Sequence, residues 1–360
     1  MSLTVAELRA ALSALALDTR GNKQTLKTRL AKHHRSTSPS PAGPAPAVPV
    51  LRERPHDQSY DSFLVFDVEA TCQVMPNHLA KLAFSYPNEI IEWPVILLQW
   101  RRDDSDRWSL EKVDEFHSFV KPTWRRELSA FCTELTGIQQ ADVDAAPTFP
   151  RLLRMFEREF INKHELFTPN NETVWVTDGP WDLRDFVAKA CYISNTPRPD
   201  WLAGEMIDLK LTVSTFFNSI KREQRESRSL SSSPSPTPSR NSTSSNEVDL
   251  EGSRATFRGL TAPPDLSIPS VLDALELDPF QGRIHSGLSD ARNLARIVID
   301  LATTRNVKLS SNRIVPDGGK GGRERRWGWM TRQGHGEVKW EQMQLYEQGK
   351  LRGTETLSRK

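Results

Sequence analysis

The chain has 360 residues, a formal net charge of +2 and 37% hydrophobic residues. This length allows two or three domains, and the composition supports one sizeable core with polar extensions rather than a compact protein throughout. The longest apolar run, Trp93 to Leu98, is far too short to cross a bilayer, and no apolar signal core begins the chain. Cys72, Cys132 and Cys191 are too few and too widely spaced for a disulfide framework or a C-x-x-C zinc site. We therefore expect a soluble protein of the cytoplasm, the nucleus or both, with no membrane partner.

Residues 1–35 predict a small helical module with a basic surface. The first predicted helix begins with Thr4 and a capping-box glutamate, Glu7, and a second runs from Lys23 to His33, each with a stripe of leucines. This arrangement, with a turn glycine and a basic second helix, resembles a SAP domain. The resemblance and the positive charge imply that the module binds nucleic acid, while a helical hairpin that docks on a protein is the alternative. The residues expected to contact RNA are Arg20, Lys23, Lys27 and Arg29.

A proline-rich segment at residues 36–58 predicts an extended tether to a second domain at residues 60–308. In this domain, apolar runs and helical periodicity predict an α/β fold, a mixed sheet flanked by helices. The predicted strands are Phe63 to Glu69, Trp93 to Trp100, Glu115 to Val120 and Thr173 to Val176. The predicted helices are Arg126 to Thr136, Phe149 to Phe160, Asp182 to Tyr192 and Ser289 to Thr303.

Two segments depart from this pattern. A Ser/Pro/Arg-rich stretch at about residues 222–256 cannot bury a core, and we expect a disordered insertion there. Residues 318–360 form a basic tail with Trp327, Trp329 and Trp340. These tryptophans could stack on bases or dock on a partner, and a frayed tail with incidental tryptophans is the alternative.

Two acids follow an apolar run at the start of the second domain. Asp67 and Glu69 lie two positions apart on the predicted strand, so both should point to one face. Burying such a pair is costly unless a positive charge lies between the carboxylates, and a hard divalent cation meets this need. Exposed acids at a strand end are the alternative.

Three further residues complete a candidate site. Asp182 directly follows Trp181 and could be a metal ligand or simply the N-cap of the next helix, and Asp178 competes with it. Asp290 lies on the apolar stripe of a helix, where an acid is unusual, and His285 precedes it by five positions.

In order and context, Asp67, Glu69, Asp182, His285 and Asp290 resemble the DEDDh family of 3′→5′ exonucleases. Residues 88–98, 128–138, 176–182 and 285–297 are similar to its Eri-type exoribonuclease branch. The resemblance implies an RNase H-like fold and two Mg²⁺ or Mn²⁺ ions held by Asp67, Glu69, Asp182 and Asp290. It also implies that His285 takes the proton from the attacking water, and that Phe131 and Trp181 sandwich the terminal base. Core packing is the alternative for Phe131.

The same resemblance implies an activity and a substrate class. We expect metal-dependent hydrolysis of phosphodiester bonds from the 3′ end, with release of nucleoside 5′-monophosphates. The implied substrates are RNA ends next to stems, in small interfering RNA, histone mRNA or ribosomal RNA, with further contacts to ribosomes or ribonucleoproteins. A DNA exonuclease of the same fold and a catalytically silent RNA-binding scaffold are the alternatives.

Overall fold

The structure is a computed structural model. It describes residues 4–15, 19, 23, 26, 30, 54–73, 86–231, 260–315, 327, 329 and 330. These residues fall into two compact units, one within residues 1–51 and one from residue 52 onward. Within the described residues, no helix is both long and apolar enough to span a membrane.

The N-terminal unit begins with helix α1 (Val5–Ala14). Thr4 caps the helix as predicted, since its side chain accepts a hydrogen bond from the Glu7 amide and Glu7 reciprocates to the Thr4 amide. The leucines of both predicted helices meet in one small core of Leu8, Leu12, Leu26 and Leu30. In the second predicted helix only Lys23, Leu26 and Leu30 are described, and each is helical.

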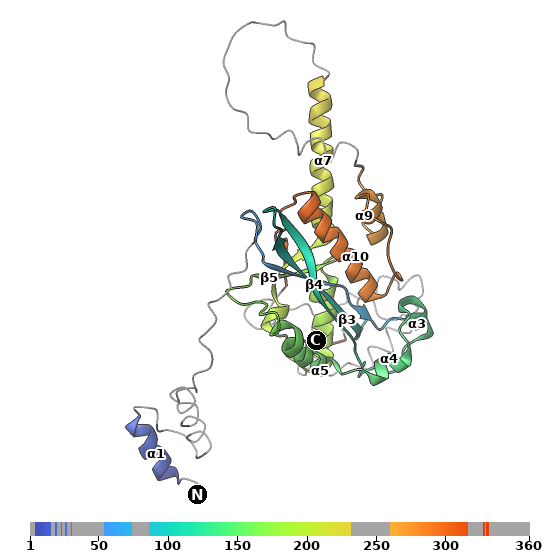
Figure 1. Cartoon of the computed structure of the whole chain (residues 1–360). Helices are drawn as coiled ribbons and strands as arrows, with labels where there is room; N and C mark the ends of the chain where they lie inside the picture. The colour runs from blue at the N-terminus through green and yellow to red at the C-terminus, as the bar shows by residue number, and fades with distance from the viewer. Residues whose placement is uncertain are drawn as a thin grey trace, which may run out of the picture. The chain divides into compact units, whose positions relative to one another are not determined.

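The second unit is built on a seven-stranded mixed sheet, which Figure 1 shows beside its helices. The strand order is β2-β3-β1-β5-β6-β7, and β4 pairs with β3. β1 is parallel to β5, and β5 to β6, whereas the pairs β1–β3, β2–β3, β3–β4 and β6–β7 are antiparallel. The strands are β1 (Ser62–Phe66), β2 (Glu69–Ala70), β3 (Ile90–Arg102), β4 (Trp108–Phe119), β5 (Thr173–Thr177), β6 (Gly204–Asp208) and β7 (Arg313–Val315).

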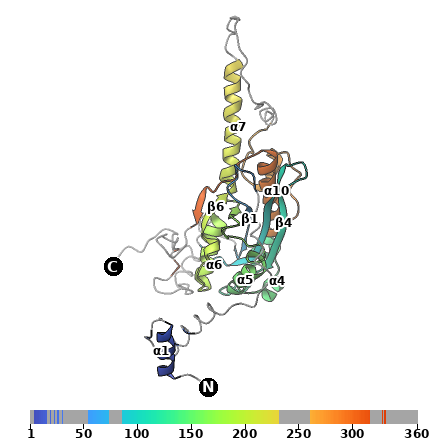
Figure 2. The same cartoon turned by 60° about the vertical axis from the view of Figure 1, so that its left-hand side comes forward.

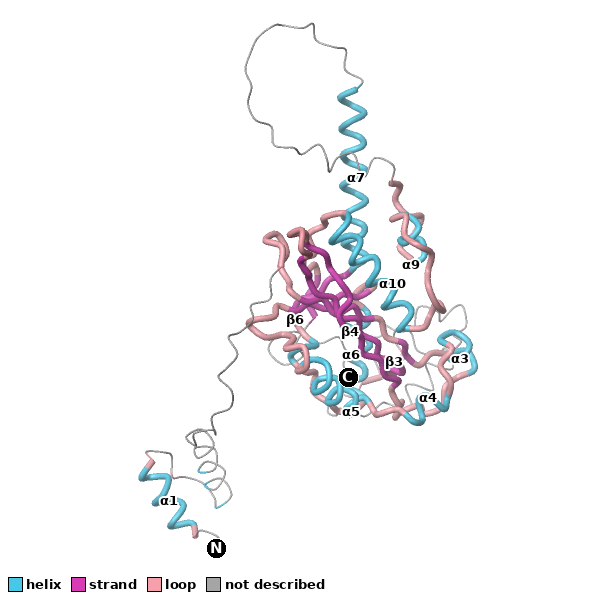
Figure 3. The backbone as a smooth tube through the Cα atoms, in the orientation of Figure 1, coloured by secondary structure: helices cyan, strands magenta, loops and turns pink. Residues whose placement is uncertain are grey.

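Helices cover both faces of the sheet. Successive side chains of β1 point to opposite faces, so they pack into two different cores. Phe63 and Val65 pack with residues of α7, α9 and α10, whereas Leu64 and Phe66 pack with residues of α5 and α6. Figure 2 shows α10 and α6 on opposite sides of β1, and Figure 3 shows the strands as one group between helices. The helices and helical turns of this unit are α3 (Ala130–Thr136), α4 (Gln140–Ala145), α5 (Phe149–Phe156), η2 (Glu157–Ile161), η3 (Asp182–Phe186), α6 (Val187–Ile193), η4 (Asp200–Leu202), α7 (Leu209–Ser231), α9 (Ile268–Ala274), α10 (Gly287–Ile299) and η5 (Asp300–Thr304).

The predicted α/β class with a mixed sheet is confirmed, but one strand differs in a way that matters for the site. The expected continuous strand from Phe63 to Glu69 is divided into β1 and β2, with Asp67 and Val68 between them. The backbone amide of Val68 donates to the Asp182 carboxylate at 3.1 Å, so a side chain takes the place of a strand partner. The strand is thus interrupted between Asp67 and Glu69, but the two side chains still line one cleft, as their expected shared face predicted.

The predicted domain limits also differ from the structure. Gln58, assigned to the tether, is buried, and its side chain bonds Val307 and Leu309, so the second unit begins before residue 60. At the other end β7 pairs with β6, which extends the unit beyond residue 308. α7 continues to Ser231 and so occupies the first part of the expected insertion. Residues 36–53 and 232–259 lie outside the described residues.

Two tryptophans of the tail pack on their own domain. Trp327 and Trp329 are 6% and 0% exposed and lie in one cluster with Tyr86 and Tyr192, together with residues of α6. The idea of a frayed tail is therefore wrong at these positions, because burial of two indoles strongly favours a docked segment. Trp340 lies outside the described residues.

Candidate active site

One cleft collects all five predicted catalytic residues and both predicted base-stacking aromatics. Its volume is about 660 Å³, and it lies between the β1–β2 break, α3, η3 and the segment before α10. The predicted residues that line it are Asp67, Glu69, Phe131, Trp181, Asp182, His285 and Asp290. Segments more than 200 residues apart in sequence thus meet at one surface.

A tight turn after β5 aims Asp182 at the β1–β2 break. Gly179 has φ +105, and a Cβ there would lie 2.1 Å from the Trp181 ring, so only glycine fits beneath the indole. Asp182 is the first residue of η3 rather than its N-cap, and its Oδ1 accepts from the Val68 amide. The N-cap interpretation of Asp182 is therefore wrong.

The helix that carries Asp290 is held close to the acidic strand by a residue that sequence reasoning missed. Glu92, 3% exposed on β3, accepts hydrogen bonds from the Gly287 amide at 2.9 Å and the Leu288 amide at 3.4 Å. A carboxylate at this position satisfies amides that the helix itself leaves unpaired. A Cβ on Gly287 would lie 2.6 Å from the Asp67 carbonyl oxygen, so glycine permits this approach. An acid in the middle of the apolar run Ile90 to Leu98 was the signal available in the sequence.

His285 lies on the exposed segment before α10, with a left-handed backbone at φ 62. The same segment carries Arg283, whose guanidinium donates to the carbonyl oxygens of Glu134 and Leu135 at the end of α3. Arg283 therefore joins the wall that carries His285 to the wall that carries Phe131.

Burial and neighbouring acids raise the pKa of all four carboxyl groups. Removal from water, followed by repulsion from Asp182 and Asp290, holds the pKa of Asp67 well above its usual range. Removal from water, followed by repulsion from Asp290 and Glu92, raises the pKa of Glu69 to about 9. Burial is also the main cause that raises the pKa of Asp182 and of Asp290 to about 7 each. Such mutual repulsion is the expected property of carboxylates that share a cation site.

The chemistry of this donor set fits hard divalent cations, which prefer carboxylate oxygens. Every charged neighbour that shifts the pKa of Asp67 is itself acidic, namely Asp182, Asp290, Glu69 and Asp178. As the side chains stand, however, no three His, Cys, Asp or Glu residues of the described chain converge closely enough to hold a metal ion. The carboxylates would therefore have to turn toward a shared cation, whose positive charge would offset the repulsion between them.

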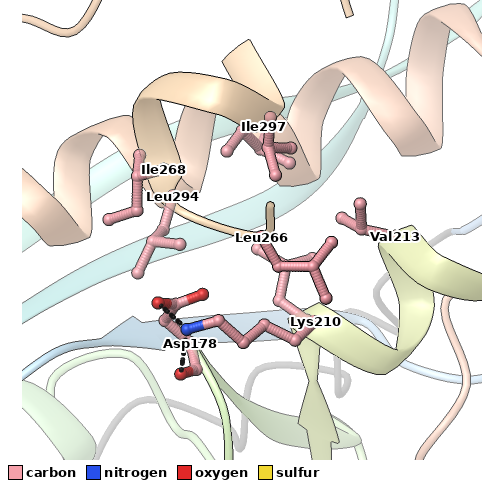
Figure 4. A pocket seen from close by; sticks show the side chains of 9 residues that line it. Asp178, Lys210, Val213, Leu266, Ile268, Leu294 and Ile297 are labelled. Carbon is pink, nitrogen blue, oxygen red and sulfur yellow. Dashed lines mark hydrogen bonds and ion pairs between the residues drawn. The ribbon is translucent and has the colours of Figure 1, made fainter. Parts of the chain in front are cut away.

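Asp178, the rival of Asp182, has a different partner. Its Oδ2 lies 2.6 Å from Lys210 Nζ, and Figure 4 shows the pair beside the apolar side chains of Leu266, Ile268 and Leu294. Lys210 also lies over the Trp181 ring, with Nζ 5.4 Å from the centroid. The charge of Asp178 is thus balanced within the protein, which supports Asp182 as the cation ligand.

The two aromatics are placed for contact with a ligand. Phe131 and Trp181 are each 37% exposed and line the cleft, so core packing does not account for Phe131. Of the four basic residues predicted in the N-terminal module, Lys23 is described and exposed, while Arg20, Lys27 and Arg29 lie outside the described residues.

Comparison with known proteins identifies the chain. The model of a family described as "Exonuclease" matches residues 64–230, and the model of the SAP domain matches residues 1–33. The chain carries an exonuclease domain and a SAP domain. The predicted resemblance is thereby confirmed, and the site lies in an exonuclease domain.

Two curated relatives and one solved structure illustrate the similarity of this exonuclease. It is 29% identical to the 3′-5′ exonuclease eri1 of Schizosaccharomyces pombe, over 86% of this chain and 90% of that protein. It is also 29% identical to the 3′-5′ exoribonuclease 1 of Rattus norvegicus, but the match spans only 65% of that protein. A structure described as 3′-end specific recognition of histone mRNA stem-loop by 3′-exonuclease aligns with TM-score 0.52 and 27% identity, over 88% of this chain and 86% of that chain.

Proposed function

We propose that this exonuclease is a metal-dependent 3′→5′ exoribonuclease that trims the 3′ ends of RNA next to stems. The observation that carries the proposal is the cleft lined by Asp67, Glu69, Asp182 and Asp290 beside two exposed rings. The comparisons support RNA as the substrate, because the relative from Rattus norvegicus is named an exoribonuclease and one similar structure is described as recognising an RNA stem-loop. Small interfering RNA, histone mRNA and ribosomal RNA are the classes with such ends, and ribonucleoproteins that present them are the proposed partners.

The four carboxylates would hold two divalent cations, Mg²⁺ or Mn²⁺, as exonucleases of this family generally use divalent metal ions. When bound, such ions lower the pKa of water and offset the charge of the scissile phosphate. Asp67 lies between β1 and β2, and Asp182 of η3 and Asp290 of α10 are the two acids that raise its pKa most. This central position makes it the residue on which the site depends most.

The other side chains position the substrate and move the proton. Phe131 and Trp181 would hold the terminal base from two faces, and base–aromatic stacking contributes about 1–3 kcal/mol per base without reading its sequence. His285 would accept the proton of the attacking water through its imidazole, since an exposed histidine can exchange that proton with solvent. The leaving strand keeps its 3′ hydroxyl, and the released nucleotide carries the phosphate at its 5′ position.

The test compares an RNA stem with a short 3′ overhang against a DNA of the same sequence, both labelled at the 5′ end, in Mg²⁺. We expect a ladder that shortens from the 3′ end, nucleoside 5′-monophosphates as products and faster turnover of the RNA. Asp67→Asn should stop the reaction, whereas Asp114→Asn, on the distant strand β4, should not. Internal cleavage, shortening from the 5′ end or a preference for DNA would contradict the proposal.

A further inference from the structure

The cleft continues at one rim into a loop that the proposed chemistry does not use. Gln73 lines the cleft together with Asp67, and its side-chain oxygen accepts a hydrogen bond from Arg125 Nη1 at 2.9 Å. Arg125 belongs to the segment between β4 and α3. A guanidinium therefore stands next to the cleft that holds the catalytic carboxylates.

A buried carboxylate fixes this loop. Glu89 is 5% exposed and accepts hydrogen bonds from three successive backbone amides, those of Thr123 at 2.6 Å, Trp124 at 3.0 Å and Arg125 at 2.9 Å. Burying a carboxylate is costly, and amide donors of this kind offset the cost only where the backbone is held in one conformation. The direction in which Arg125 leaves the backbone is thus set before any ligand arrives.

Aromatic rings support the guanidinium from below. Its carbon lies 5.4 Å from the ring centroids of Tyr86 and of Trp124, and these two rings are 5.9 Å apart. Trp124 in turn packs against the buried cluster that includes Trp327 and Trp329, so the docked tail braces the same surface. Trp124 and Arg125 are half-exposed, whereas Tyr86 is buried. We call Gln73, Tyr86, Trp124 and Arg125 the Arg125 shelf.

We propose that the Arg125 shelf binds the single-stranded RNA just upstream of the 3′ nucleotide, with Arg125 on a phosphate and Trp124 against a base. This inference rests on the proposed function. An RNA strand whose 3′ nucleotide lies among the carboxylates needs a cation for its phosphates on the 5′ side of that nucleotide. A guanidinium offers paired donors that match a phosphate. Aromatic rings beside basic side chains suit nucleic acid, because every base presents a face for stacking. Preorganisation by Glu89 lowers the entropic cost of binding.

The kinetic test varies the length of the substrate. The full chain is given a dinucleotide and an octanucleotide of single-stranded RNA, each labelled at its 5′ end. The dinucleotide is too short to reach beyond the cleft, so Arg125→Gln should raise the KM of the octanucleotide about tenfold relative to that of the dinucleotide, with kcat unchanged. Arg125→Lys should recover part of this difference, because it restores the charge without the planar donors. Arg126→Gln, a neighbouring exposed arginine, should leave the length dependence as it is.

A second readout does not depend on turnover. In a His285→Ala background, 4-thiouridine placed two or three nucleotides before the 3′ end should photo-crosslink to Trp124, and Arg125→Gln should reduce the yield. The inference is overturned if no crosslink reaches the shelf, or if Arg125→Gln changes both substrates equally or neither. Failure of the proposed function is a separate result, namely that the wild-type chain shortens neither RNA.

Discussion

Asp290→Asn should raise the free energy of unfolding of the nuclease unit at pH 8 in the absence of metal ions. The same substitution should abolish the activity of the protein in Mg²⁺. Asp290 is 6% exposed, and burial raises its pKa from the ordinary value of 3.8 to about 7. This rise corresponds to about 4 kcal/mol of free energy that disfavours the ionised form in the folded state. Relaxation and screening by the open cleft reduce the measurable effect, and we expect the variant to gain about 1–3 kcal/mol.

The pH dependence has a definite sign. Because the pKa of Asp290 is higher in the folded state, the protonated carboxyl group stabilises the fold. This contribution of Asp290 to the free energy of unfolding is fully present below pH 3.8 and is lost as the pH rises through about 7. The advantage of Asp290→Asn should therefore be absent near pH 4, grow between pH 4 and 7, and remain constant at higher pH. Urea unfolding in EDTA, followed by tryptophan fluorescence at pH 4, 6 and 8, measures this difference.

Asp300→Asn is the matched control, because Asp300 is also a buried acid and directly follows α10. Its Oδ2 lies 3.0 Å from Arg305 Nε, so this charge has a partner. Removal of that charge leaves a buried guanidinium without this carboxylate and should destabilise the unit at pH 8. A loss of stability in both variants at pH 8 would refute the argument, since Asp290 would then be an ordinary structural acid.

Three further predictions concern activity and RNA binding. Asp182→Asn should lower kcat by at least about a thousandfold, whereas Asp178→Asn should retain measurable activity because Asp178 is balanced by Lys210; equal losses in steady-state assays would contradict the assignment. His285→Ala should lower the single-turnover rate, and an unchanged rate would point to another base. Removal of residues 1–50 should reduce the slope of log affinity against log salt by about 0.7 for each lost phosphate contact in single-stranded RNA; an unchanged slope in binding titrations would show that the SAP domain does not bind the RNA.

Much of the site could be predicted from single residues that break a pattern. Asp290 on an apolar stripe and two acids after an apolar run are conspicuous because burial of a charge needs a reason. The element types around them followed from periodicity, and the helices from Phe149 and from Asp182 were found close to their observed limits. The other half of the sheet was harder. β6 and β7 are short and partly exposed, so their strand pattern is weak.

Sequence alone determined the residue types of the catalytic set, the basic helical module and the mixed α/β class, because these depend on local charge, spacing and hydrophobic period. Tertiary structure decided what no local pattern contains. It divided the first strand at Asp67 and placed Glu92 against the first turn of the helix that carries Asp290. It also paired Asp178 with Lys210, whereas Asp182 has no ion pair among the described contacts. Each of these features depends on which groups distant in sequence meet in the fold. The free energy of a buried charge is set by the groups around it in space rather than by its neighbours in sequence.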